Sequence, residues 1–156
     1  MSGKTLLKIK KILVAIDKSG YKDKVVSYAF TLAKSLGAEI SVIHVVDQSS
    51  MVAAASIHPA SSMMSAQKEY QDALIQDADK LLKGIVQLGK NDGITVHDKV
   101  LAGSSVKQTI LDYAKDKEAD MIIIGTKGMT GIKKFLVGSV ANDVISHAHC
   151  PVLAVR

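Results

Sequence analysis

A glycine-rich segment in the last third of the sequence contains the residue types that bind phosphate groups. Gly125, Gly128 and Gly131 follow one another at intervals of three residues, and glycine lets a ligand approach the backbone because it has no Cβ atom. The N–H groups of such a loop can surround an anion. Gly138-Ser139 then places the free N–H groups of a predicted helix start nearby, where phosphate is favoured. Each of these residues alone more often only ends a strand or caps a helix, but together they predict a site for a phosphate-bearing ligand.

Basic side chains accompany the glycines. Lys127, Lys133 and Lys134 lie in a stretch, residues 121–142, that has no acidic residue. Neither the G-x-x-x-x-G-K-[ST] phosphate loop nor the G-x-G-x-x-G dinucleotide fingerprint occurs at the expected place. The predicted site is therefore of a less common kind.

A carboxylate, Asp17, follows the first predicted strand, where dinucleotide-binding domains have glycines. Because a carboxylate repels phosphate, we expect Asp17 to lie near a base, a ribose or a metal ion. An equally good interpretation is an Asx turn or an N-cap at the first helix, since aspartate is typical of both.

The elements that must position these residues alternate between short apolar runs and helical stripes. Gly37 should end the first helix and Gly89 the second, while Ser105 and Gln108 have the spacing of a capping box. The predicted strands are Ile12–Ile16, Ile40–Val46, Ile94–Leu101, Met121–Ile124 and Val152–Val155. The predicted helices are Tyr21–Leu36, a stripe from Tyr70 to Leu88, one from Ser105 through Tyr113, and one beginning near Ser139.

Repeated strand–helix units predict the fold class α/β, a doubly wound (Rossmann-like) five-stranded parallel sheet with helices on both faces and strand order 3-2-1-4-5. Ile94–Leu101 alternates in polarity and should be an edge strand. Ligands of such sheets bind at the carboxyl ends of the strands, where the strand order reverses. His44 lies within an apolar strand and should be a hydrogen-bonded core residue.

Length and composition fit one domain spanning residues 1–156. Hydrophobic residues make up 47% of the chain and charged residues 22%, which excludes a disordered chain. The single cysteine, Cys150, cannot form an internal disulfide and should be a small buried apolar group rather than a nucleophile. The segment 48–65 is rich in serine, alanine and methionine, and we expect a flexible loop or a plain disordered connection.

The formal net charge of +5 comes from the two ends of the chain. Residues 1–10 form a predicted basic arm, and the remaining excess lies at the glycine-rich segment. With 4% aromatic residues and no tryptophan, little is available to stack on bases, so nucleic acid is not an expected partner. No apolar run has the roughly 20 residues that a membrane span needs. We therefore expect no membrane partner and a soluble, cytoplasmic protein.

Four segments together resemble the ATP-binding subgroup of the universal stress protein family. They are the Gly125-x-x-Gly128-nine residues-Gly138-Ser139 spacing, the opening Ile12-Leu13-Val14-Ala15-Ile16-Asp17, the middle Ile43-His44-Val45 and the close Cys150-Pro151-Val152-Leu153-Ala154-Val155. The resemblance implies a stress-response regulatory protein that binds ATP, or ADP or AMP, with Mg²⁺ or Mn²⁺ at the phosphates in some members. It also implies a homodimer, which would pair the apolar edge strand 152–155 across two subunits.

The resemblance assigns binding roles to individual positions. The adenosine part of the ligand is implied to contact Ala15, Ile16, Asp17 and Val45, with Gly103 bordering it. Ribose and phosphates are implied to contact Ile124, Gly125, Thr126, Lys127, Gly128, Gly131, Gly138, Ser139 and Val140.

Catalysis is not expected beyond slow hydrolysis, because no set of carboxylates is available to hold a metal ion and orient a water molecule. Two alternatives stay open. One is a dimeric interaction module that binds no nucleotide. The other is an adenylating enzyme, although Asp17-Lys18-Ser19-Gly20 lacks the Ser-Gly-Gly-x-Asp-Ser loop of that class.

Overall fold

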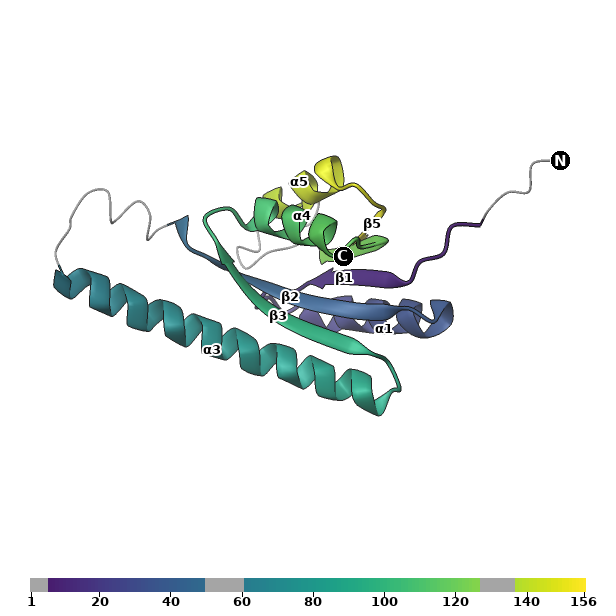
Figure 1. Cartoon of the computed structure of the whole chain (residues 1–156), viewed down its shortest axis with the longest axis horizontal. Helices are drawn as coiled ribbons and strands as arrows, with labels where there is room; N and C mark the ends of the chain where they lie inside the picture. Colours follow the sequence, from purple (N-terminus) through teal and green to yellow (C-terminus); the bar gives the residue numbers. More distant parts are fainter. Residues whose placement is uncertain (1–5, 50–60, 127–136) are drawn as a thin grey trace.

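The computed structural model describes residues 6–49, 61–126 and 137–156. Its strands are all parallel and lie in the order β3-β2-β1-β4-β5, as predicted (Figure 1). The elements are β1 (Lys11–Ala15), α1 (Lys22–Leu36), β2 (Glu39–Asp47), α3 (Ser61–Asn91), β3 (Val96–Gly103), α4 (Val106–Asp116), β4 (Met121–Gly125), α5 (Ser139–His147) and β5 (Val152–Val155).

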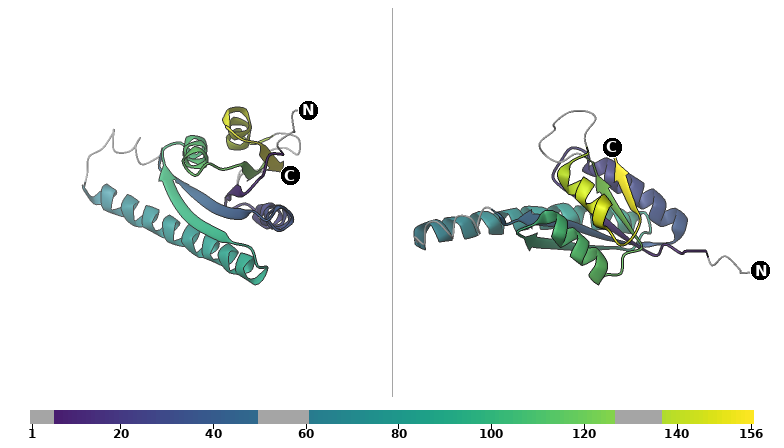
Figure 2. Two further views of the ribbon diagram at one scale, coloured as in Figure 1. Left: turned by 45° about the vertical axis from the view of Figure 1, so that its right-hand side comes forward. Right: turned by 90° about the horizontal axis from the view of Figure 1, so that it is seen from above.

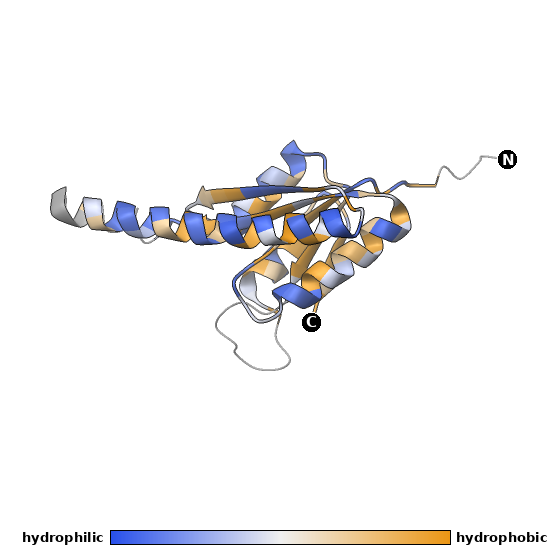
Figure 3. Ribbon diagram, turned by 90° about the horizontal axis from the view of Figure 1, so that it is seen from below, coloured by the Kyte–Doolittle hydropathy of each residue, from blue (hydrophilic) through white to orange (hydrophobic). Residues whose placement is uncertain are grey.

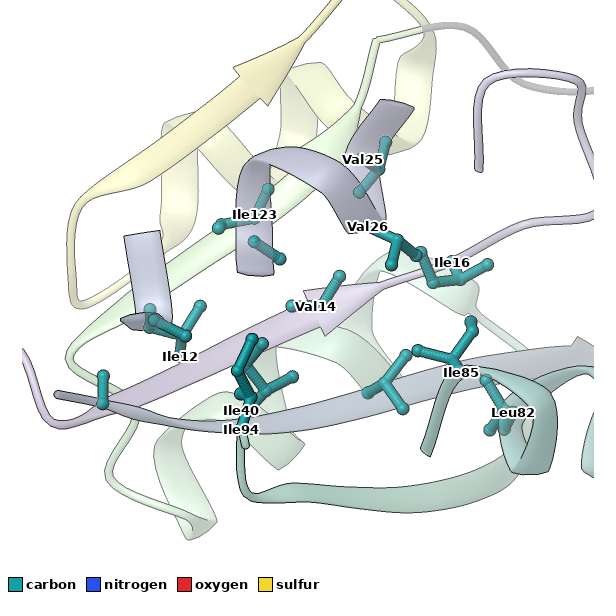
Figure 4. Close-up of a cluster of buried hydrophobic side chains, with 14 of the residues drawn as sticks. Ile12, Val14, Ile16, Val25, Val26, Ile40, Leu82, Ile85, Ile94 and Ile123 are labelled. Atoms are coloured by element: carbon teal, nitrogen blue, oxygen red, sulfur yellow. The ribbon is translucent and has the colours of Figure 1, made fainter. Parts of the chain in front are cut away.

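The helices cover the two faces of this sheet in pairs. Side chains alternate along a strand, so Ile12 and Val14 of β1 pack with α1 and α3, while Leu13 and Ala15 pack with α4 and α5. Figure 4 shows the first of these two clusters, in which Leu82 and Ile85 of α3 lie close to β1 and β2, and Figure 1 shows the helices on opposite sides of the strands. The doubly wound prediction is confirmed.

The amino end of β1 is fixed between its two neighbours. The Asp120 carboxylate accepts hydrogen bonds from the backbone N–H groups of Lys10 and Lys11 at 2.8 and 2.9 Å, and the Lys10 carbonyl accepts one from Glu39 N–H at 2.8 Å. Ile9 packs against the first core cluster. These contacts attach Ile9 and Lys10, the last residues of the predicted basic arm, to the folded body, whereas Leu6 and Leu7 are exposed.

Helix α3 is longer than predicted at both ends. It begins at Ser61, so residues 61–65 of the predicted loop 48–65 are helical, while residues 50–60 lie outside the described part of the chain. The amino-terminal part of α3 extends past the sheet in every view (Figures 1 and 2), and Met64 and Tyr70 are exposed there. Tyr70, where the predicted apolar stripe starts, therefore lies outside the core, and the buried apolar face of α3 begins at Ala78.

The carboxyl end of α3 corrects the prediction that Gly89 closes this helix. The helix continues to Asn91, and the left-handed residue is Gly93, with a φ of 71°. Gly89 is buried, and a Cβ atom built on it would collide with the side chain of Val96. Gly89 therefore lets α3 lie close to the start of β3, a packing requirement that sequence alone does not separate from a helix end.

Other predicted ends are confirmed in part. Gly37 ends α1 with a φ of 63°. Ser105 Oγ accepts from Gln108 N–H at 3.4 Å, but the Gln108 side chain donates to Asp112 instead of returning to the cap, so only half of the capping box forms. β3 is an edge strand as predicted, shifted two residues toward the carboxyl end.

Hydropathy follows the packing of the helices. In Figure 3, α3 alternates between apolar and polar residues along its length, as expected for a helix with one face on the sheet. Within residues 6–49, 61–126 and 137–156, no helix is both long and apolar enough to cross a bilayer.

Candidate functional site

A crevice of about 260 Å³ opens at the carboxyl ends of β1 and β4. β1 lies between β2 and β4, and the helices that follow β1 and β4 pack on opposite faces of the sheet. The connections therefore diverge at this point, which is where doubly wound sheets bind ligands. The volume is just below the roughly 300 to 1,000 Å³ typical of small-molecule sites.

The structure brings most of the predicted site residues together in this crevice. Three others, Lys127, Gly128 and Gly131, lie outside the described residues, and Gly103 does not line the crevice. The predicted residues that line it are Ala15, Ile16, Asp17, Val45, Ile124, Gly125, Thr126, Gly138, Ser139 and Val140.

Gly103 has a different environment from the other predicted site residues. It ends β3, which β2 separates from β1, and its carbonyl accepts from Gln48 N–H at 2.8 Å. A Cβ atom on Gly103 would collide with the Thr109 side chain of α4. In this structure, Gly103 allows the close approach of α4 to β3.

Further crevice residues were not predicted as part of the site. Most of them come from helices. The regular spacing of apolar residues shows which side of a helix is buried, and Val25 and Ile110 lie on that side, but it does not show whether a residue packs in the core or lines a cavity. Together with Ile43, these side chains give the crevice apolar walls suited to a flat ring. The additional lining residues are Lys22, Val25, Ile43, His44, Val106, Ile110 and Ala141.

Asp17 satisfies one of its two predicted descriptions and is compatible with the other. Its Oδ1 atom accepts from Ser19 N–H at 3.0 Å, which confirms the Asx turn. It is not the N-cap of α1, since that position is Tyr21. The carboxylate also lines the crevice, so it can form the turn and still face a ligand.

The two described ends of the glycine-rich segment meet at the crevice. Thr126 N–H donates to the Val155 carbonyl at 2.8 Å, and the Thr126 carbonyl accepts from Gly138 N–H at 2.7 Å. Gly138, with φ −59° and ψ 153°, is the N-cap of α5 and makes no side-chain cap. The first N–H groups of a helix have no partner within it, and Ser139, Val140 and Ala141 all line the crevice. The site therefore includes a helix start that can receive an anion.

The backbone of β2 forms another wall. Ile16 N–H donates to the Ile43 carbonyl at 2.9 Å, so Ile43 and Val45 direct their backbone groups toward β1. β1 ends at Ala15, and Val45 lines the crevice beside it. One N–H donor and one C=O acceptor of the same residue consequently face the place where a ligand would bind.

Metal and acid–base groups are sparse in this site. In the described residues, no group of three or more His, Cys, Asp or Glu side chains is arranged to hold a metal ion, and Asp17 is the one carboxylate among the described lining residues. Mg²⁺ usually keeps several water ligands and is held in part by the phosphates of its ligand. A metal ion at this site would therefore arrive with the phosphates and need not contact Asp17.

Several other titratable groups lie outside the crevice lining. The Lys107 ammonium, 2.8 Å from Asp143, lowers the pKa of that carboxyl. His147 Nδ1 lies 2.8 Å from the Asp143 carbonyl. Burial raises the pKa of the Cys150 thiol, so this cysteine stays protonated at neutral pH and is a poor nucleophile.

The fold and the site together define a doubly wound α/β domain with a ligand crevice at its topological switch point. The family model described as the universal stress protein family matches residues 8–156. The chain belongs to the universal stress protein family.

Individual relatives agree with this assignment. Universal stress protein MJ0531 of Methanocaldococcus jannaschii is 35% identical over 147 residues, covering 94% of this chain and 82% of the relative. The universal stress protein UspA from Lactobacillus plantarum superposes with a TM-score of 0.83 at 25% identity, covering 97% of this chain and 100% of that one. A universal stress protein from Archaeoglobus fulgidus, solved in complex with dAMP, has the same fold, with a TM-score of 0.63 at 24% identity and coverage of 96% and 100%.

Proposed function

We propose that this protein binds an adenine nucleotide, ATP or its products ADP and AMP, in the crevice at β1 and β4. In this proposal it acts as a nucleotide-dependent regulatory protein of the stress response. The observation that carries the proposal is the convergence of the Val45 backbone, Asp17 and the first turn of α5 on one crevice.

The adenosine part of the ligand fits the β1–β2 side. The Val45 N–H and C=O complement the N1 acceptor and the exocyclic amino donor of adenine. Val25, Ile43 and Ile110 supply apolar surface for the ring, and the Asp17 carboxylate can accept hydrogen bonds from ribose hydroxyls. A carboxylate placed there keeps the phosphates at the other end of the crevice, because like charges repel.

The phosphates fit the β4–α5 side. The first turn of α5 offers backbone N–H groups and a positive helix end, with Gly125 and Gly138 beside it. Lys127, Gly128 and Gly131 belong to the segment between these residues and are proposed to complete the phosphate site. The dAMP complex of the Archaeoglobus protein supports the proposal, since a protein of the same fold binds an adenine nucleotide.

Any hydrolysis is proposed to be slow, with Mg²⁺ or Mn²⁺ carried by the phosphates. Rapid phosphoryl transfer needs a residue that positions the attacking water, and Asp17 is proposed to lie at the adenosine end. The alternative function is a nucleotide-independent interaction module, which would leave the unpaired backbone groups of the crevice unexplained.

Titration calorimetry with ATP tests the proposal, and Asp17→Asn distinguishes the two uses of Asp17. The asparagine oxygen can still accept from Ser19 N–H, so the Asx turn should persist. Loss of the charged acceptor for ribose should weaken ATP binding about tenfold, since hydrogen bonds to charged groups contribute about 1.5 to 3 kcal/mol. Absence of ATP, ADP and AMP binding to the unaltered protein contradicts the proposed function. Equal affinity of the variant and the unaltered protein assigns Asp17 to the turn alone.

A homodimer through β5 completes the proposed assembly. β5 is an edge of the sheet, and Val152, Leu153 and Ala154 are only half-buried. Pairing this strand with its copy across a two-fold axis would cover an exposed edge. Light scattering should give the mass of a dimer at micromolar concentration, and Leu153→Lys should shift it toward the monomer. A monomer mass for the unaltered protein would contradict the dimer.

A further inference from the structure

We infer that His44 is a positioning residue: by donating to the Ile16 carbonyl, it takes the place of Val45 N–H in the sheet and leaves the Val45 backbone available to a nucleobase. The inference rests on the proposed function for the identity of the ligand. The hydrogen-bond geometry stands without it.

The geometry begins with the alternation of the parallel ladder. In such a ladder, the N–H and C=O of one residue face the same neighbouring strand, and the next residue faces the other side. Glu39 N–H donates to the Lys10 carbonyl at 2.8 Å, on the β1 side, and Ile40 N–H donates to the Thr95 carbonyl at 2.9 Å, on the β3 side. The odd-numbered residues of β2, including Val45, therefore face β1.

The ladder between β1 and β2 stops one bond early. Its last bond runs from Ile16 N–H to the Ile43 carbonyl at 2.9 Å. The next bond in a continuing ladder would join Val45 N–H to the Ile16 carbonyl. Among the described residues, no such bond forms, and the Ile16 carbonyl lies 2.7 Å from His44 Nδ1. Since a carbonyl only accepts, the proton of this hydrogen bond is on Nδ1.

The substitution of one donor for another has two consequences. The Ile16 carbonyl is satisfied, so β1 can turn away from β2 without leaving a buried acceptor unpaired. Val45 N–H, in a residue that is 9% exposed and lines the crevice, is left with its donor facing the ligand space. His44 also fixes the peptide that leads into Asp17.

The backbone N–H and C=O that Val45 presents to the crevice predict which base the crevice prefers. Adenine offers an acceptor at N1 beside an amino donor, which matches an N–H beside a C=O. Hypoxanthine, the base of ITP, offers an N1–H donor beside a carbonyl acceptor, the reverse arrangement. A site built on buried backbone groups rejects a ligand that leaves them unpaired. His44 should therefore affect discrimination between ATP and ITP more than binding as such.

The experiment compares His44→Leu with His44→Asn. Leucine removes the donor, so the Ile16 carbonyl should recapture Val45 N–H. The ratio of ATP to ITP affinity, measured by calorimetry, should then fall about tenfold, the value of roughly one hydrogen bond. Asparagine carries an amide N–H near the position of Nδ1 and should restore the ratio. Amide hydrogen exchange without nucleotide should show Val45 N–H exchanging faster than its β2 neighbours, and protected in His44→Leu.

The outcomes separate this inference from the proposed function. Protection of Val45 N–H in the unaltered, nucleotide-free protein would overturn the inference whether or not ATP binds. Equal losses of ATP and ITP affinity in His44→Leu, with no rescue by asparagine, would also overturn it by making His44 a general structural residue. Failure of the unaltered protein to bind either nucleotide would defeat the proposed function, while the exchange of Val45 N–H would still decide the role of His44.

Discussion

Replacing Gly138 with valine should weaken ATP binding about a hundredfold and leave the fold intact. Gly138 lines the crevice, and its φ of −59° is open to any L-residue, so a side chain adds no backbone strain. The branched side chain would occupy space beside the first turn of α5, where the phosphates are proposed to bind. An overpacking cost of about 3 kcal/mol corresponds to this loss of affinity. Calorimetric titration with ATP measures it.

Gly20→Val is the matched control for this change. Gly20 lies in the connection between β1 and α1, it does not line the crevice, and a Cβ atom on it meets no other atom within 4 Å. The ATP affinity of the Gly20→Val variant should stay within about twofold of that of the unaltered protein, as expected for a surface substitution. Equal ATP binding by Gly138→Val and Gly20→Val would place the phosphates elsewhere.

Replacing each of two glycines of α3 with alanine should change the free energy of unfolding in opposite directions. Gly84→Ala should stabilise the protein by up to about 1 kcal/mol, because alanine favours a helix interior and its Cβ atom meets nothing within 4 Å. Gly89→Ala should destabilise it by about 2 kcal/mol, since its Cβ atom collides with the side chain of Val96. Urea unfolding of both variants gives the two free energies of unfolding.

Each glycine variant serves as the control for the other, because both make the same chemical change in one helix. A gain in stability for Gly89→Ala would mean that α3 and β3 are further apart than the structure shows. Neither residue lines the crevice, so ATP affinity should not change in either variant.

The strand order and the place of the site could be predicted because they depend on features that local sequence carries. Continuous apolar runs identify strands covered on both faces, and one such run directly precedes Gly125. An edge strand such as β3 exposes alternate side chains, and the polar residues Thr95, His97 and Lys99 of the alternating segment are exposed. Asp17 and Gly138, which both line the crevice, could be assigned to it from the sequence because each lies within two residues of a strand end or a helix start.

Features set by contacts between distant segments could not be predicted. Gly89 resembles a helix end until Val96 is placed against it. Val25 and Ile110 resemble ordinary core residues until the space between them is known. His44 was correctly predicted to be hydrogen-bonded, but its partner, the Ile16 carbonyl, lies 28 residues away. Its effect on Val45 becomes visible only from the register of β1 and β2.

The placement of β1 between β2 and β4 has a consequence for the order of folding. The Asp120 carboxylate that holds the start of β1 is 110 residues from Lys10, whereas β1 and β2 are joined by one short helix. Pairings that close such long loops form slowly, so we expect β4 and β5 to join the sheet after β1, β2 and β3. The crevice lies at the carboxyl ends of β1 and β4, the pairing that we expect to form late. A bound nucleotide would hold both sides together and add about 1.4 kcal/mol to stability for each tenfold excess over its Kd.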